Sequence, residues 1–91
     1  MKAVSKELMI VNRLGLHARA AAALVKVASR FDCEVTITKD GQAVNGKSIL
    51  GLMTLAAAKG STILVGCDGR DQGSALRAIE DVVAGRFGEA E

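Results

Sequence analysis

The chain has a single histidine, His17, in the stretch VNRLGLHARAAAALVKVA, where a loop is expected to lead into an alanine-rich helix. A helix N-terminus exposes free backbone N–H groups and the positive end of the helix dipole, so it attracts anions. Near pH 7 a neutral imidazole offers a nucleophilic nitrogen, and Gly15 lets the chain turn sharply or approach a ligand closely. Arg19 adds a permanently charged fork that suits phosphate oxygens. These residues predict a histidine that takes up a phosphoryl group, with the anion held on the helix end at the backbone of Ala18 and Arg19.

Other interpretations of the same residues stay open at this point. His17 can be a surface residue or a stand-in for a helix N-cap, and Arg19 can be a solvated helix residue. A stand-alone hydrolase or transferase with His17 as general base needs convergent polar partners. None lies at a recognisable spacing from His17, and Asp32 or Asp68 could come near it only if the fold happened to bring them together. In a regulatory module, phosphorylation would only switch binding partners.

A second segment, GKSILGLMTLAA, combines a helix start with too many apolar residues for one buried face. Ser48 can cap a short helix here, although Gly51 weakens that helix. On so short a helix, four apolar residues cannot all face inward: Ile49, Leu50, Leu52 and Met53. Either two or three belong to the core and the rest are incidental, or some form an exposed docking patch beside His17. A methionine suits a surface that accepts several partners.

The elements that must position these residues follow from apolar spacing and turn chemistry. Strands are expected at residues 6–11, 34–39, 42–45 and 61–67, and Asp40-Gly41 marks a hairpin between the middle two. Helices are expected from Ala18 to about Phe31, over residues 49–57, and from Asp71 or Ser74 to Gly85 or Gly88.

The resulting order, β-α-β-β-α-β-α, predicts an α+β open-faced sandwich in which a four-stranded antiparallel sheet has one face covered by three helices and the other face wet. The core is expected to be aliphatic, around Phe31 and Phe87. The first helix is expected to bury Ala21, Leu24, Val25 and Ala28. The last helix is expected to bury Leu76, Ile79, Val82, Val83 and Phe87.

Composition narrows the class of protein. Ninety-one residues with 49% hydrophobic residues are expected to form one domain, 1–91, with a modest core. A net charge of +2, with no Tyr or Trp, gives neither the basic stripe nor the stacking platform of a nucleic-acid-binding protein. Cys33 and Cys67 form no CxxC motif and are expected to be free thiols in a reducing cytosol. With no signal peptide and no apolar run of about 20 residues, the chain is predicted to be cytoplasmic, without membrane insertion.

The motifs GLHARAAA and NGKSILGLMTLAAAKGS closely resemble the HPr family, the histidine-containing phosphocarriers of the bacterial phosphotransferase system. The resemblance covers nearly the whole chain. It implies that His17 is phosphorylated on Nδ1, that Arg19 assists, and that Ser48 is a second, regulatory phosphorylation position. It assigns partner docking to Ile49, Leu50 and Met53. The implied protein is a monomeric carrier without turnover, cofactor or metal. Its phosphoryl donor is Enzyme I, charged from phosphoenolpyruvate, and its acceptors are IIA proteins or domains. A serine kinase/phosphorylase would act on Ser48.

One position departs from the family pattern. The sugar-type motif reads G-[IL]-H-A-R-P-A, and this chain has Ala20 at the proline position. Proline fits the first turn of a helix because its missing N–H has no partner there. Alanine keeps the helix, so phosphotransfer is expected to survive. The HARAA form is common in the nitrogen-related branch, called NPr, whereas GKSILGLM resembles the sugar-type regulatory region, so both branches stay open.

Overall fold

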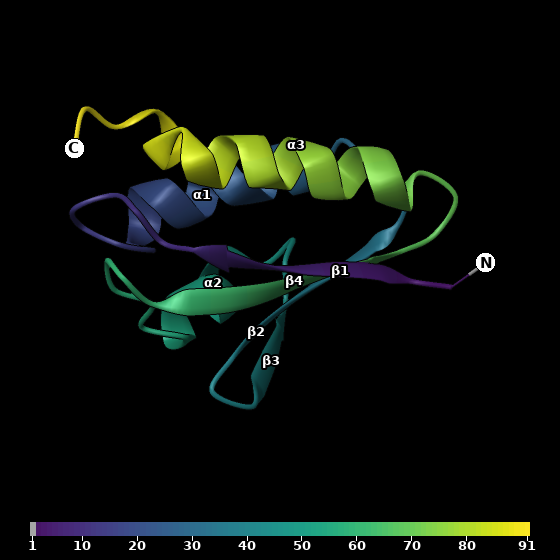
Figure 1. The fold of residues 1–91 in the computed structure, drawn as a ribbon, viewed down its shortest axis with the longest axis horizontal. Helices are drawn as coiled ribbons and strands as arrows, with labels where there is room; N and C mark the ends of the chain where they lie inside the picture. The colour runs from purple at the N-terminus through teal and green to yellow at the C-terminus, as the bar shows by residue number, and fades with distance from the viewer. Residues whose placement is uncertain (1) are drawn as a thin grey trace.

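Strands and helices follow one another in the predicted order. The computed structural model describes residues 2–91, and Figure 1 shows their course from the N-terminus to the C-terminus. The elements are β1 (Val4–Met9), α1 (Ala18–Ala28), β2 (Glu34–Lys39), β3 (Gln42–Asn45), α2 (Ile49–Thr54), β4 (Thr62–Asp68), α3 (Gln72–Ala84) and a final 3-10 turn, η1 (Arg86–Gly88).

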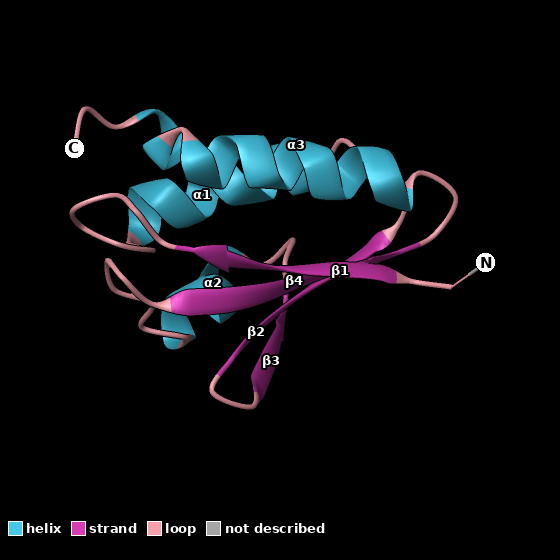
Figure 2. Cartoon of the chain, viewed as in Figure 1, coloured by secondary structure: helices cyan, strands magenta, loops and turns pink. Residues whose placement is uncertain are grey.

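The four strands form one antiparallel sheet in the order β1-β4-β2-β3. Helices α1 and α3 lie side by side along one face of this sheet, whereas α2 lies against α1 and β3 (Figures 1 and 2). Along β4, Ile63 and Val65 are buried beneath the helices while Leu64 between them is exposed, as expected of a sheet with one covered face. The predicted fold class, an open-faced α+β sandwich, is confirmed.

The core is aliphatic, as composition predicts. Its largest fully buried side chains come from every layer: Ile10, Leu24, Ile37, Leu52, Ile63, Val65, Ile79 and Val83. Phe87 is also buried. Phe31 was expected at the centre, but it is only half-buried and packs against the margin of the core.

Two helices are shorter than their sequences indicate. Helix α1 ends at Ala28 rather than near Phe31. After the C-cap Ser29, the backbone N–H groups bond three residues back: Arg30 to the Val27 carbonyl at 3.1 Å and Phe31 to that of Ala28 at 3.2 Å. Helix α2 ends at Thr54 rather than at residue 57, because Ala56 takes a left-handed conformation with φ +49°.

Strand limits and two helix faces also differ from the predictions. Strand β1 occupies Val4–Met9 rather than 6–11, and β4 is shifted by one residue to Thr62–Asp68. In α1, Ala20 joins the buried face and Val25 is half-buried. In α3 the buried residues are Gln72, Ala75, Ile79 and Val83, while Leu76 and Val82 are half-buried. Phe87 reaches the core from η1, where the chain has left the helix.

Candidate functional site

His17 is the N-cap residue of α1. Its backbone is extended (φ −75°, ψ −179°) and its carbonyl accepts the N–H of Ala21 at 2.8 Å, which begins the helix. The preceding loop is fixed against the segment between α2 and β4, because the Leu16 N–H donates to the Ala57 carbonyl at 2.8 Å. The sequence prediction of a histidine at a helix start is thus matched by the position of this residue.

The imidazole of His17 has a carboxylate partner that no sequence pattern indicated. Its Nε2 shares a hydrogen bond with Oε2 of Glu89, which lies just beyond η1. The other oxygen of Glu89 accepts the side-chain amide of Asn12 at 2.9 Å, and the same amide nitrogen donates to the Gly15 carbonyl at 2.8 Å. Sequence analysis predicts neither Asn12 nor Glu89 as a partner of His17, because no local motif or helix or strand spacing relates either residue to it.

Electrostatics keep this carboxylate ionised. The hydrogen bond from Asn12 is the largest cause that lowers the pKa of Glu89 below its usual value, and the hydrogen bond and charge of His17 and the charge of Arg19 lower it further. A carboxylate only accepts hydrogen bonds, so the shared hydrogen belongs to Nε2. In the neutral ring Nδ1 is then the nitrogen with the free lone pair. The arrangement therefore presents Nδ1 as the nucleophile.

Arg19 lies in the first turn of α1, on the same side as the C-terminal residues. Its side chain is exposed and lines a hollow of about 340 Å³ together with Arg13, Leu14, Glu89, Ala90 and Glu91. The backbone N–H groups of Ala18 and Arg19 belong to the first turn of the helix, where intrahelical carbonyl partners are lacking. A cation and free donors therefore stand at the end of the helix that carries His17.

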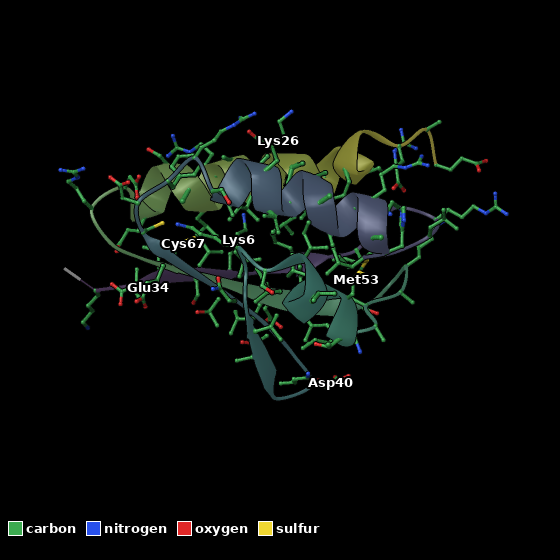
Figure 3. All side chains as sticks on the ribbon, turned by 180° about the vertical axis from the view of Figure 1, so that it is seen from behind. Lys6, Lys26, Glu34, Asp40, Met53 and Cys67 are labelled. Atoms are coloured by element: carbon green, nitrogen blue, oxygen red, sulfur yellow. The ribbon has the colours of Figure 1, made fainter. Side chains whose placement is uncertain are left out.

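A second hollow, of about 280 Å³, is lined in part by His17. The side chains that line it are apolar apart from the imidazole and include Leu14, Leu16, Met53 and Ala56. Figure 3 shows Met53 on α2, near the start of α1. The structure thus brings one residue of the expected docking patch into the same hollow as His17.

The predicted docking residues are exposed. Leu50 is 77% exposed, Met53 42% and Ile49 40%, whereas Leu52 between them is fully buried. Leu14, 65% exposed, extends the same apolar surface and was not predicted. We call these four exposed residues the apolar patch: Leu14, Ile49, Leu50 and Met53.

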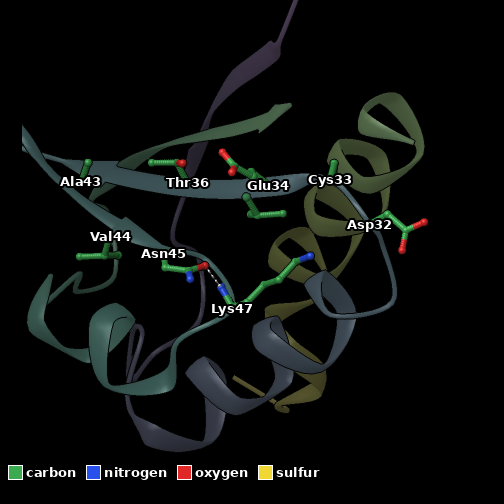
Figure 4. Close-up of a pocket in the computed structure, with 9 residues that line it drawn as sticks. Asp32, Cys33, Glu34, Thr36, Ala43, Val44, Asn45 and Lys47 are labelled. Carbon is green, nitrogen blue, oxygen red and sulfur yellow. Dashed lines mark hydrogen bonds between the residues drawn. The ribbon is translucent and has the colours of Figure 1, made fainter. Parts of the chain in front are cut away.

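Ser48 is the N-cap of α2. Its Oγ accepts the Gly51 N–H at 3.0 Å, so the capping role predicted from sequence is confirmed. Lys47 does not point toward His17, because its ammonium donates to the Phe31 carbonyl at 2.6 Å. A third hollow, of about 480 Å³, lies beside Lys47 and is lined mainly by β2 and β3 residues (Figure 4), and His17 is not part of it.

The two cysteines are buried thiols rather than reactive groups. Burial is the main cause that raises the pKa of both, that of Cys67 to about 11. They are therefore protonated near neutral pH and are poor nucleophiles. Across residues 2–91, no three His, Cys, Asp or Glu side chains gather as a metal site requires. In the same residues, no helix has the length and apolar character needed to cross a bilayer.

Comparison with known proteins shows the family to which this fold belongs. A family model described as the PTS HPr component phosphorylation site matches residues 4–85. The chain is 50% identical over 88 residues to the phosphocarrier protein HPr of Neisseria meningitidis, covering 97% of this chain and 99% of that protein. It is 46% identical over 83 residues to the HPr of Xylella fastidiosa, covering 91% and 93%.

Solved structures give the same result. A crystal structure of HPr from Thermoanaerobacter tengcongensis superposes with a TM-score of 0.90 at 38% identity, over 100% of both chains. One from Bacillus anthracis gives 0.87 at 41% identity, over 91% of this chain and 99% of that one. These similarities define the class as a phosphocarrier of the phosphotransferase system. Within that class, the chain belongs to the HPr family.

Proposed function

We propose that the chain accepts a phosphoryl group from Enzyme I on Nδ1 of His17 and passes it to IIA proteins or domains. The observation that carries this proposal is the hydrogen bond between Nε2 of His17 and Glu89, which leaves Nδ1 as the free nucleophile at a helix N-terminus. In this proposal the chain is a cytoplasmic, monomeric carrier. It has no turnover of its own, because it is itself the phosphorylated species in each transfer.

The roles around His17 follow from phosphoryl chemistry, in which positioning and charge stabilisation supply most of the catalysis. Nδ1 attacks phosphorus while the bond to the donor breaks. The backbone N–H groups of Ala18 and Arg19 hold the phosphoryl oxygens, and the Arg19 guanidinium neutralises their charge. Because Arg19 is exposed, its side chain is free to reach the phosphoryl group while that group is on Enzyme I or on a IIA protein.

Partner docking is assigned to Ile49, Leu50 and Met53, with Leu14 beside them. Contiguous exposed apolar surface marks interaction sites, and this one shares a hollow with His17. A partner that covers it would also exclude water from the transfer. A serine kinase/phosphorylase acting on Ser48 would place a dianion at the edge of this patch.

The same chemistry serves either branch of the system. Ala20, which replaces the usual proline, is fully buried in α1 and so preserves the packing of the helix. The sugar-uptake branch is the first proposal and the nitrogen-related, NPr-like branch is the alternative. The two differ in their acceptors, so the acceptor identifies the branch.

The experiment is a transfer assay with Enzyme I and labelled phosphoenolpyruvate. Wild type is expected to acquire acid-labile label and to pass it to a IIA acceptor from one branch in preference to the other. The His17→Ala variant should acquire none while its NMR spectrum remains that of a folded protein. Equal labelling of this variant would contradict the proposal. Label that stays on the wild-type chain and reaches no IIA acceptor would favour a regulatory module.

A further inference from the structure

Hydrogen bonds hold the segment from Glu89 to Glu91 next to the candidate site. The Arg13 N–H donates to the Glu91 carbonyl at 2.9 Å, and the Arg13 guanidinium pairs with the Glu91 carboxylate at 3.1 Å. Before this segment, Phe87 is buried and takes a left-handed conformation, which turns the chain back toward α1. Glu89 is thereby held between two anchors, and its carboxylate reaches His17.

From this geometry we infer that Glu89 is a positioning residue for His17, and that Asn12 holds Glu89 in place. The inference rests on the proposed function of His17. Glu89 fixes the imidazole in the tautomer that carries its hydrogen on Nε2, and it orients the ring with Nδ1 toward the incoming phosphoryl group. A carboxylate that orients an imidazole in this way is a common device in nucleophilic sites.

Asn12 is suited to this role by its burial and its bonding. It is fully buried, and its amide nitrogen is divided between the Gly15 carbonyl and Oε1 of Glu89. Its own Oδ1 accepts no hydrogen bond from residues 2–91. A buried polar atom left without a partner is costly, so an apolar residue would serve stability better. The amide instead supplies the one donor that keeps Oε2 of Glu89 directed at His17.

The contact also fits the charge changes of the transfer. When Nδ1 forms its bond to phosphorus, the bond to the donor breaks and its electron pair leaves with the donor. The ring then carries phosphorus on Nδ1 and hydrogen on Nε2, so it gains positive charge opposite the Glu89 carboxylate. When the phosphoryl group moves on, the electron pair of the N–P bond returns to Nδ1. The hydrogen on Nε2 stays in place in both steps.

The simplest alternative is that Glu89 only fastens the C-terminal residues. Glu91→Ala is a matched control. It removes a carboxylate that pairs with Arg13 and makes no hydrogen bond or ion pair with the imidazole among the described residues. The backbone hydrogen bond from the Arg13 N–H to the Glu91 carbonyl, which anchors this segment, remains. Glu89→Ala removes both the charge and the acceptors. Glu89→Gln removes the charge and leaves one acceptor oxygen where Asn12 and His17 use two. All three variants change a residue beyond the last helix, so they are expected to fold.

The test combines two readouts on the full chain. The ¹⁵N shifts of Nδ1 and Nε2 report the tautomer of His17 without any partner protein. Phosphorylation of this chain by a saturating concentration of Enzyme I reports the transfer rate. We expect Glu89→Ala to lose the Nε2–H preference and to slow transfer about ten-fold, with the KM for Enzyme I unchanged. Glu89→Gln should weaken the Nε2–H preference, because its one carbonyl oxygen cannot accept from both Asn12 and His17. It should also transfer more slowly than wild type, and Glu91→Ala should match wild type.

Three outcomes would overturn the inference: a wild-type tautomer and rate in Glu89→Ala, a faster rate in that variant, or equal losses in Glu91→Ala. The failure of the proposed function is distinguishable from these. In that case wild type itself would not be labelled, whereas the tautomer of His17 would still respond to Glu89→Ala.

Discussion

Gly15 lies against the Ala57 carbonyl so closely that a Cβ on Gly15 would be 2.4 Å from that oxygen. Its φ of +67° is also one that L-residues rarely adopt. This contact holds the loop that carries His17 against the segment after α2. The glycine predicted to permit a close approach is therefore used for packing against the protein's own backbone.

Gly15→Ala is expected to lower the free energy of unfolding by about 2–4 kcal/mol, since strain and overpacking add. It should also slow phosphorylation by displacing His17. Urea denaturation and the transfer assay measure the two effects. Gly60→Ala is the matched control, because Gly60 has φ +90° but nothing within 4 Å of its added Cβ. Equal losses in both variants would mean that backbone strain alone is responsible.

Arg19→Ala tests charge stabilisation at the phosphoryl group. Loss of a charge-assisted contact typically costs about 1.5–3 kcal/mol, which corresponds to a rate lower by roughly ten- to a hundred-fold. Label should still appear on His17, but slowly. Arg30→Ala, just beyond the far end of α1, should transfer at the wild-type rate. A wild-type rate in Arg19→Ala would show that the guanidinium is a bystander.

The order of elements and two local devices were predictable from sequence because their signals are local. Asp40-Gly41 forms the hairpin with φ of +50° and +82°, and Ser48 caps α2. Glu89 was not predictable as a partner of His17. The two residues are 72 positions apart, and no periodicity of the intervening chain relates one to the other. The contact exists only because η1 turns the chain after Phe87. The ends of α1 and α2 were misplaced because 3-10 bonds and the left-handed Ala56 depend on tertiary packing.

The apolar patch should respond to partners in an NMR titration. Addition of Enzyme I is expected to shift the amide signals of Leu14, Ile49, Leu50 and Met53 together with those around His17. Leu50→Lys should weaken this binding, since Leu50 is the most exposed member, with little loss of stability. Leu64→Lys, on the open face of the sheet, is the control. Shifts confined to α3 would place the interface elsewhere.

Ser48→Asp and Ser48→Ala separate capping from regulation. Alanine removes the acceptor for the Gly51 N–H and should cost about 1 kcal/mol of stability. Aspartate keeps a capping oxygen, so the thermal midpoint should stay close to wild type. Its charge beside the apolar patch should weaken Enzyme I binding and slow phosphorylation of His17, as the larger charge of a phosphoserine would. If Ser48→Asp binds Enzyme I as tightly as wild type at low salt, Ser48 acts only as a helix cap and not as a regulatory position.

Cys67 predicts a loss of stability in alkaline solution. Burial, and next the neighbouring Cys33, raises the pKa of its thiol from 9.0 to about 11 in the folded protein. Between these two values the unfolded chain ionises while the folded chain keeps its proton, so the unfolded state binds fewer protons. The free energy of unfolding must then fall as pH rises through this window. Two pH units correspond to about 2–3 kcal/mol.

Urea denaturation between pH 8 and pH 11, with a reducing agent present, measures this slope. The Cys67→Ala variant is expected to be less stable at pH 8, because it leaves a small cavity in the core. Its stability should nevertheless decline less steeply than that of wild type, so the two curves converge as pH rises. Lysines titrate in both proteins and cancel in the difference. Parallel curves would show that the Cys67 thiol ionises in the folded chain as readily as in the unfolded one.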